Sequence, residues 1–305
     1  MAAIYVGANS FARALRYVRM NSHLRQYRLR IVCPAVLVTL LFSSCGGGAA
    51  STAANPVAMP KLGAISYWSV STLYDQLPSG AIAVVNPSNG IFTGQTTTLT
   101  PDVASYAAIV STAATRNVAM LGYVPTGYFS HACNIATQCQ TWARIDAQVQ
   151  AYFQNMSGLA GIFFDEASPT TWNCAAFVAE YQRLRDIVHL YNAHAKVAFN
   201  AAVPDTCVVD ATAAGEIAVL FEGGLASYQN QATIVAAATA SAVGKGVVSW
   251  HLVHSAATGS DLASAFAQAS ASKVTLFYAT DKTPGANVWN SLPTYWQQEL
   301  GLMGY

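Results

Sequence analysis

The chain has 305 residues, of which 53% are hydrophobic and 10% are charged, so a sizeable apolar core is expected. Its formal net charge is only +1, but residues 1–45 contain six arginines and no acid, whereas residues 46–305 carry a net charge of −5. Nucleic-acid-binding proteins present basic patches, so this acidic balance argues against a nucleic-acid partner. It is compatible with neutral or cationic substrates.

Residues 1–45 have the layout of a secretory signal peptide. Arginines between positions 13 and 30 precede an apolar run over 31–42, and small residues follow that run. The run is too short to span a bilayer comfortably as a helix. A translation start at Met20 instead of Met1 would give a signal of ordinary length.

The end of this signal resembles that of a bacterial lipoprotein, in which a cysteine becomes the lipidated first residue of the mature chain. The sequence over 41–45 is Leu-Phe-Ser-Ser-Cys, and Phe42 departs from the usual Leu. We therefore predict an exported protein that is held at the membrane only by a lipid on Cys45, in the bacterial cell envelope. Ordinary cleavage near Ala53, followed by secretion, is the alternative. Residues 46–60, rich in Gly, Ala, Ser, Thr and Pro, predict a flexible linker.

Eight short apolar or β-rich runs recur through residues 61–305, which we predict to form a single domain. The runs cover 62–67, 81–85, 118–124, 161–164, 196–199, 217–221, 246–250 and 274–278. Helix-compatible stretches alternate with them at 101–115, 142–156, 173–193, 233–243, 261–270 and 293–303, and only short helices fit the first and fifth units. Eight such units predict an α/β fold, a (β/α)₈ TIM-type barrel. A doubly wound open sheet is the alternative, but its G-x-G-x-x-G loop is missing after the first run.

Four cysteines follow the signal and linker, namely Cys133, Cys139, Cys174 and Cys207. In an exported protein an even number of cysteines favours disulfides, and their spacing does not match a zinc site. Three pairings are possible. We predict Cys133 with Cys139 and Cys174 with Cys207, because these cysteines fall in loops after predicted strands. His131 is interpreted as a loop residue rather than a metal ligand.

Two of the predicted strands end in carboxylic acids. The run at 161–164 leads directly into Asp165 and Glu166, and the run at 217–221 leads into Glu222. The carboxyl ends of barrel strands line the active-site mouth, and acids are seldom buried without a partner. We expect Asp165 and Glu222 to face each other there. The alternative is that Asp165 caps the next helix and Glu166 is solvated.

Amides and aromatic residues occupy the other predicted strand ends, which hold Tyr67, Trp68, Asn86, Tyr123, Asn200, Trp250, His251 and Tyr278. Amides and carboxylates bond sugar hydroxyls, while aromatic rings stack on the apolar face of a pyranose. Hydrolysis of a glycosidic bond needs one carboxylate and one carboxylic acid, so the whole set predicts a carbohydrate site. Each aromatic residue taken alone is more often core filler, and Asn86 before Pro87 also suits a turn.

Other chemistries have less support in the sequence. No serine lies in a G-x-S-x-G elbow, which disfavours an esterase of that kind. His251 and His254 have no H-E-x-x-H or H-x-H pattern around them, so we expect neither a metal nor an organic cofactor. A metal-dependent polysaccharide deacetylase would need a spacing of His and Asp that is also missing.

Several short motifs occur in a fixed order: Val85-Asn86-Pro87, Gly122-Tyr123-Val124 with Thr126 and Tyr128, Gly161 to Glu166, Asn200, and Phe221-Glu222. This series resembles the spherulin-4-like family, which includes glycoside hydrolase family 135, over residues 62 to 300. The resemblance implies a (β/α)₈ barrel that hydrolyses polymers of α-1,4-linked N-acetylgalactosamine or galactosamine, as in biofilm exopolysaccharides. It implies catalytic positions at Asp165, Glu166 and Glu222, and it includes Thr126 and Tyr128 among the substrate-binding residues.

Two loops depart from the family pattern. Many relatives have Gly and then Arg after the position of Tyr128, where this chain has Phe129, Ser130 and His131. The position of Asn200 is often followed by Pro-Gly, where this chain has two alanines. Both loops are expected to contact substrate, so the changes bear on sugar preference more than on reaction type.

We predict a monomeric, endo-acting and retaining glycosidase. Asp165 is expected to be the nucleophile, because a strand end holds a side chain rigidly. Glu222 is expected to be the general acid and then the base, since burial after Phe221 raises its pKa. Glu166 is expected to orient substrate or to tune Asp165, although the two acids could exchange roles. The alternative is a non-catalytic polysaccharide-binding lipoprotein whose acids only bind sugar hydroxyls.

Overall fold

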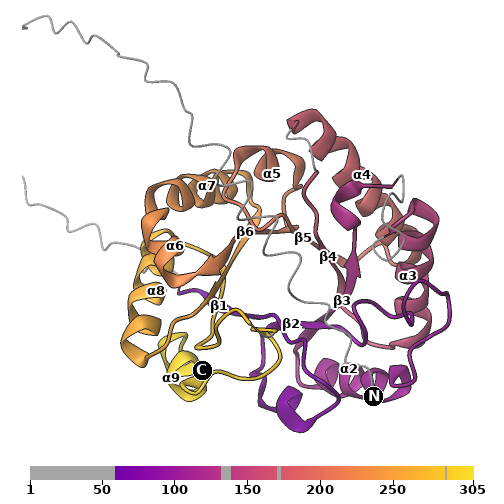
Figure 1. Cartoon of the computed structure of the whole chain (residues 1–305), viewed down its shortest axis with the longest axis horizontal. Coiled ribbons are helices and arrows are strands. Elements are labelled where there is room, and N and C mark those ends of the chain that lie inside the picture. The colour runs from indigo at the N-terminus through magenta and orange to yellow at the C-terminus, as the bar shows by residue number, and fades with distance from the viewer. Residues whose placement is uncertain (1–58, 132–138, 170–172, 286) are drawn as a thin grey trace, which may run out of the picture. The chain divides into compact units, whose positions relative to one another are not determined.

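The computed structural model describes residues 59–131, 139–169, 173–285 and 287–305. Eight parallel strands form a closed barrel in chain order, seen end on in Figure 1. They are β1 (Lys61–Ala64), β2 (Ile82–Val85), β3 (Ala119–Pro125), β4 (Gly161–Asp165), β5 (Lys196–Asn200), β6 (Ile217–Gly224), β7 (Val248–His254) and β8 (Leu276–Ala279). The prediction of a (β/α)₈ barrel is confirmed. The predicted signal, Cys45 and most of the linker lie outside the described residues.

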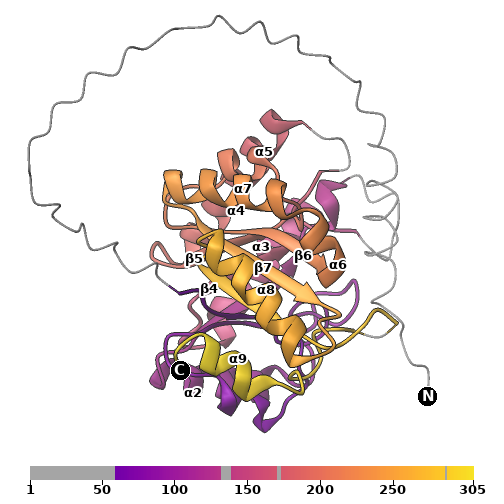
Figure 2. The same ribbon diagram turned by 90° about the vertical axis from the view of Figure 1, so that its left-hand side faces the viewer.

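Helices surround the barrel, and Figure 2 shows α7 and α8 on the outside of its strands. The helical elements are η1 (Thr72–Gln76), α2 (Val103–Thr115), η2 (Gly127–Phe129), α3 (Trp142–Asn155), α4 (Cys174–Tyr191), α5 (Thr206–Ala211), α6 (Leu225–Asn230), α7 (Ala232–Lys245), α8 (Gly259–Ala271) and α9 (Trp296–Leu302). As expected, the first and fifth units have short helices. The six-residue α6 was not predicted. None of the described helices is long and apolar enough to cross a membrane.

The two-residue period of β4 decides which way its acid points. Phe163 packs inside the barrel against Trp250 of β7, with ring centroids 5.6 Å apart. Phe164 points to the helix layer and packs against Phe199, which stacks on Tyr181 of α4 at 4.0 Å. Successive side chains alternate between the two faces of a strand. Asp165 therefore lies on the same side as Phe163, toward the barrel axis.

Trp250 fills the barrel interior and requires a glycine opposite it. Its indole N–H donates a hydrogen bond of 2.8 Å to the carbonyl oxygen of Gly63 in β1. A Cβ at Gly63 would lie 2.7 Å from that indole nitrogen, which is too close for any side chain. The predicted strand-end residue Trp250 is therefore core filler.

A bulge in β6 changes the direction of Glu222. Val219 is in register with Trp250, so it shares the interior side, and strict alternation would place Phe221 inside as well. The register shifts between Val219 and Phe221, so Phe221 pairs with His251 and packs against Tyr228 of α6, with centroids 4.8 Å apart. The extra residue moves Phe221 to the helix layer and turns Glu222 inward.

A disulfide joins the first turns of two neighbouring helices. Cys174 begins α4 and Cys207 lies in α5, and their Cα atoms are 4.8 Å apart. Both helices follow strands that end in polar residues, β4 and β5, so the disulfide ties together the two loops above them. The predicted pairing of Cys174 with Cys207 is confirmed. Cys139 is disulfide-bonded, and its predicted partner Cys133 lies outside the described residues.

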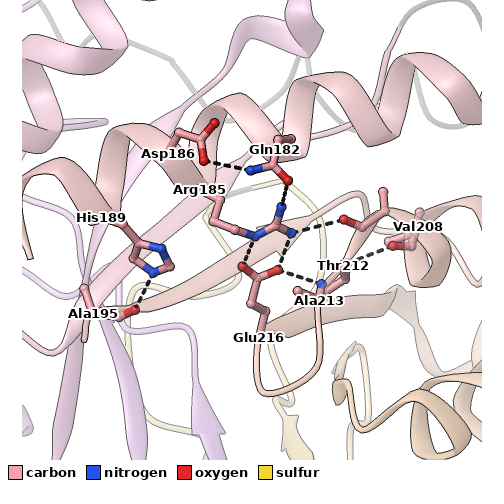
Figure 3. A network of polar contacts seen from close by, with 10 residues as sticks. Gln182, Arg185, Asp186, His189, Ala195, Val208, Thr212, Ala213 and Glu216 are labelled. Carbon is pink, nitrogen blue, oxygen red and sulfur yellow. Dashed lines mark hydrogen bonds and ion pairs between the residues drawn. The ribbon is translucent and has the colours of Figure 1, made fainter. Parts of the chain in front are cut away.

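An ion pair holds α4 against the turn that leads into β6 (Figure 3). The guanidinium group of Arg185 donates to both carboxylate oxygens of Glu216 and to the carbonyl oxygen of Ala211, at 3.2 Å. Glu216 also accepts the backbone N–H of Ala213 at 2.8 Å. The two side chains are only 14% and 9% exposed, so water can replace little of this pairing. The pair therefore fixes the start of the strand that carries Glu222.

The disulfide should contribute to folding stability. In the wild type the disulfide cross-links the unfolded chain across 33 residues, and replacing both Cys174 and Cys207 by Ala removes this constraint. In the entropic model this costs about 3 to 4 kcal/mol of unfolding free energy, measured by urea denaturation without reductant. Reductant should lower the unfolding free energy of the wild type by at least as much, because it also opens the disulfide of Cys139. An unchanged urea midpoint in both experiments would show that the bridge does not stabilise the fold.

The ion pair of Arg185 and Glu216 should matter more than an exposed one. We expect Glu216→Gln to lower the unfolding free energy by about 2 to 3 kcal/mol, because it leaves a largely buried guanidinium without a counter-charge. The matched control is Asp210→Asn, which breaks the pair with Lys245, where both side chains are about half exposed. That loss should stay below about 1 kcal/mol. Equal losses in the two variants would contradict this ranking.

Candidate active site

Side chains from four consecutive strands meet at the carboxyl end of the barrel. Tyr123 of β3, Asp165 of β4, Asn200 of β5 and Glu222 of β6 are linked by side-chain hydrogen bonds. Asn200 is only 4% exposed and Tyr123 only 3%. The acids that end two predicted strands are therefore brought together, as the sequence predicts.

The side-chain amide of Asn200 lies between the two acids. Its nitrogen donates to Asp165 Oδ1 at 2.8 Å and to Glu222 Oε2 at 2.6 Å. Its oxygen accepts the backbone N–H of Ala202 at 3.0 Å, which fixes the amide orientation because an NH₂ group could not accept that proton. The two carboxyl oxygens lie no further apart than the sum of the two distances, about 5.4 Å, and the range typical of retaining glycosidases is about 5 to 5.5 Å.

The outer oxygen of each acid has its own donor. The Tyr123 hydroxyl donates to Asp165 Oδ2 at 2.7 Å. The indole N–H of Trp289 donates to Glu222 Oε1 at 3.1 Å. Trp289 lies in the segment between β8 and α9, which has no strand or helix pattern, and no sequence motif points to it. Both carboxyl groups are thus held by N–H or O–H donors at both oxygens.

Tyr67 completes the arrangement from the loop after β1. Its ring packs edge-on against Tyr123, with centroids 5.2 Å apart at 86°, and its backbone N–H donates to the Trp289 carbonyl at 3.2 Å. Burial and the nearby charges of Asp165, Glu222 and Glu166 raise the pKa of the Tyr67 hydroxyl. A closed ring of contacts therefore runs through six residues: Glu222, Trp289, Tyr67, Tyr123, Asp165 and Asn200.

The shared burial of the two acids disfavours a double negative charge. Burial, followed by the charge on Asp165, raises the pKa of Glu222 to about 7, against the lowering effect of the bonds from Asn200 and Trp289. Burial also raises the pKa of Asp165, but hydrogen bonds from Tyr123, the Glu166 backbone and Asn200 oppose it. The environment therefore favours a proton on Glu222 and a charge on Asp165, which is the division that acid catalysis with a nucleophile needs.

Glu166 has an unusual backbone conformation and makes hydrogen bonds of its own with the loop after β3. Its φ is +57°, in the left-handed region that residues with a side chain seldom adopt. Its Oε2 accepts the Gly127 N–H at 3.1 Å, and its carbonyl oxygen accepts the Thr126 hydroxyl at 2.7 Å. Thr126 is fully buried, so it supports Glu166 rather than presenting a surface to substrate.

Strained backbone gathers at this end of the barrel. Besides Glu166, five residues with a side chain in the loops that follow strands have positive φ angles of 53° to 60°: Asn89, Tyr128, Phe129, Ala202 and Ser255. Each such residue costs of order 1 to 3 kcal/mol, and such positions concentrate at functional sites. Tyr128 is half-buried in the loop after β3, beside the strand that carries Tyr123. In the described parts of the chain, no group of three His, Cys, Asp or Glu residues is placed to hold a metal ion.

Comparison with known proteins shows the family to which this chain belongs. The sequence profile of the family described as "Spherulation-specific family 4" matches residues 63–303, which include all six residues of the contact ring. The chain belongs to this family. A curated relative, Spherulin-4 of Physarum polycephalum, is 25% identical over 221 residues, which are 72% of this chain and 60% of the relative.

A solved structure similar to this family member is that of Aspergillus clavatus Sph3, crystallised in complex with GalNAc. It matches with a TM-score of 0.60 and 18% identity, and the match covers 81% of this chain and 98% of Sph3. At this identity the likeness establishes the shared barrel fold. The chain matches 60% of the length of the Physarum relative.

Four of the predicted substrate-binding residues lie elsewhere. Both ring nitrogens of His251 are bonded in the helix layer, to Tyr228 at 2.8 Å and to Thr239 at 3.0 Å, and burial lowers its pKa to about 3. Trp68 is fully buried and packs against the ring of Tyr74.

Tyr278 is likewise fully buried, and it packs against Trp289 and Trp296. The side-chain oxygen of Asn86 accepts the Gly90 N–H at 2.9 Å, as in a turn. Tyr278 and Asn86 therefore stabilise loops of the barrel, and neither side chain contacts the acids in the structure.

The raised pKa of Glu222 should make the protein less stable as the pH rises. A carboxyl with a folded-state pKa of about 7, against an ordinary 4.5, contributes stability that is present below pH 4.5 and is lost by pH 7. Relative to Glu222→Gln, the wild type should therefore lose about 1 to 3 kcal/mol of unfolding free energy between these pH values. Urea denaturation of both proteins from pH 4 to 8 measures the difference. Parallel curves would mean that the Glu222 pKa is not raised.

Proposed function

We propose that this protein is an exported, endo-acting glycoside hydrolase that cleaves exopolysaccharide containing α-1,4-linked N-acetylgalactosamine or galactosamine. The observation that carries the proposal is the amide nitrogen of Asn200, which donates to two buried carboxyl groups at once. It sets two acids about 5.4 Å or less apart with unequal proton affinities. This spacing supports retention of configuration through a covalent intermediate.

In this mechanism Glu222 starts protonated and gives its proton to the glycosidic oxygen as the bond to the leaving sugar breaks. Asp165 attacks the anomeric carbon and forms a glycosyl ester. Glu222, now a carboxylate, takes a proton from water, and the resulting hydroxide displaces Asp165. The Tyr123 hydroxyl and the Asn200 amide hold Asp165 in place through bonds of 2.7 and 2.8 Å. The charge on Asp165 favours the proton on Glu222 that the first step needs.

The substrate class rests on the family and on the composition of the site. The structure of Aspergillus clavatus Sph3, which has the same fold, is a complex with GalNAc. Here the acids are bordered by Tyr67 and by the loop of Tyr128, whose rings can contact an apolar sugar face. Glu166 lies one residue beyond Asp165, where a third carboxylate suits hydroxyl groups or an amine of the sugar. The net charge of −5 over residues 46–305 does not repel a cationic polymer.

We propose that the domain works outside the cytoplasm, tethered through a lipid on Cys45 and the linker over 46–60. The bridge between Cys174 and Cys207 fits this location, because disulfides persist in oxidising compartments. Secretion after cleavage near Ala53 is the alternative. Mass spectrometry of the N-terminal peptide from membrane and culture fractions distinguishes a lipidated Cys45 from a free terminus near Ala53.

Removing either acid should stop catalysis without unfolding the protein. We expect Asp165→Asn and Glu222→Gln each to lower kcat by at least about 10² to 10⁴-fold on a galactosaminogalactan-type polymer. Each change keeps the shape of the side chain, so binding of the polymer should largely persist. Product oligosaccharides are measured by mass spectrometry, and binding by affinity electrophoresis. A mechanism-based label should attach to Asp165 in the wild type and be lost in Asp165→Asn.

The control is Asp210→Asn, which removes an exposed acid of α5 and should leave turnover unchanged. Wild-type turnover in both site variants would reject the proposed acid pair. If the wild-type protein bound amino-sugar polymers but released no oligosaccharides, the binding-lipoprotein alternative would replace the glycosidase. Release of acetate without shortening of the chain would instead indicate a deacetylase.

A further inference from the structure

We propose that Trp289, from the segment between β8 and α9, is the positioning residue that orients the carboxyl group of Glu222 for proton transfer. The inference rests on the proposed role of Glu222 as general acid. Neither the family match nor the similarity to Sph3 assigns a role to this tryptophan. Its indole N–H donates to Glu222 Oε1 at 3.1 Å, on the opposite oxygen from the one that Asn200 holds.

The surroundings of Trp289 hold its ring in one place. It is 4% exposed, and its ring packs against Tyr278 at 5.8 Å and His254 at 6.3 Å between centroids. Its backbone N–H donates to the Asn287 side chain at 2.9 Å, and its carbonyl oxygen accepts the Tyr67 N–H at 3.2 Å. A side chain locked by packing and backbone bonds can define a catalytic geometry, whereas a mobile one cannot.

Two donors are needed to define the plane of the Glu222 carboxyl group. A bond from Asn200 to Oε2 alone would leave the group free to turn about its last carbon–carbon bond. The second bond, from Trp289 to Oε1, removes that freedom. A carboxyl group has four lone-pair positions, of which these donors occupy two, so the acidic proton is restricted to the remaining directions. One of these can face the glycosidic oxygen in each catalytic cycle.

The same bond affects the proton affinity of Glu222. An N–H that donates to a carboxylate stabilises its charged form, so Trp289 lowers the pKa of Glu222 against the effect of burial. Loss of the indole should therefore raise this pKa. Because a general acid is active only while protonated, the alkaline limb of the rate profile should then move to higher pH.

The test is Trp289→Phe, which keeps an aromatic ring and removes the N–H. We expect kcat to fall about tenfold or more while KM stays within about twofold, and the alkaline limb of kcat/KM to rise by about half to one pH unit. The matched control is Trp296→Phe. Trp296 is also buried and packs against Tyr278, but its indole N–H has no hydrogen-bond partner among the described residues. The control should keep the wild-type pH profile.

A second measurement needs no turnover and no destabilised variant. In NMR spectra of the wild-type protein recorded across pH, the chemical shift of the Trp289 indole N–H should change with the same midpoint as that of the Glu222 carboxyl carbon. This change of the indole signal should vanish in Glu222→Gln. If no polymer is cleaved but the two signals titrate together, the positioning contact stands and the glycosidase proposal fails. If the indole resonance is insensitive to Glu222, or if Trp289→Phe and Trp296→Phe shift the pH profile equally, the assignment of Trp289 is overturned.

Discussion

The site depends on one amide nitrogen that two buried carboxyl groups share. Two carboxylates this close to each other in a poorly solvated site repel strongly, so the fold must supply donors for every oxygen. Asn200 serves the inner oxygens, while Tyr123 and Trp289 serve the outer ones. The amide can do this only because the backbone of Ala202 fixes its orientation. Burial and the charge on Asp165 raise the pKa of Glu222, whereas hydrogen bonds from Tyr123, the Glu166 backbone and Asn200 oppose the rise that burial causes in the pKa of Asp165. The two acids therefore differ in proton affinity.

The barrel is a rigid support for this arrangement. Each of the four strands β3 to β6 supplies one side chain of the ring of contacts, and the pairing of neighbouring strands sets their heights. The disulfide between α4 and α5 lies just beyond the loops that follow Asp165 and Asn200. At the start of β6, Arg185 and Glu216 fix the strand that ends in the second acid. The disulfide and the ion pair thus both stabilise elements that neighbour or carry the acids.

Much of the fold and all of the contact ring except Trp289 could be predicted from the sequence. All eight strands follow from short apolar runs, and two of these runs stop abruptly at a carboxylate, which predicts the positions of the acids. Trp289 could not be predicted, because it lies in an irregular segment without periodicity and reaches Glu222 through a long-range contact. The prediction that His251 contacts substrate is wrong for a different reason. It follows Trp250 in β7, and neighbours in a strand face opposite sides, so a tryptophan that fills the barrel sends the histidine into the helix layer.

The bulge in β6 means that the backbone conformation of the strand, and not only residue identity, decides whether this protein has two acids in its site. If Leu220 continued the regular alternation instead of forming the bulge, Phe221 would enter the barrel and Glu222 would point among the helices. Such a strand would still read Phe-Glu at its end. A deletion of Leu220, by contrast, would remove the extra residue and leave Glu222 facing inward. The pairing register of this strand therefore reveals where the acid points, whereas the motif alone does not.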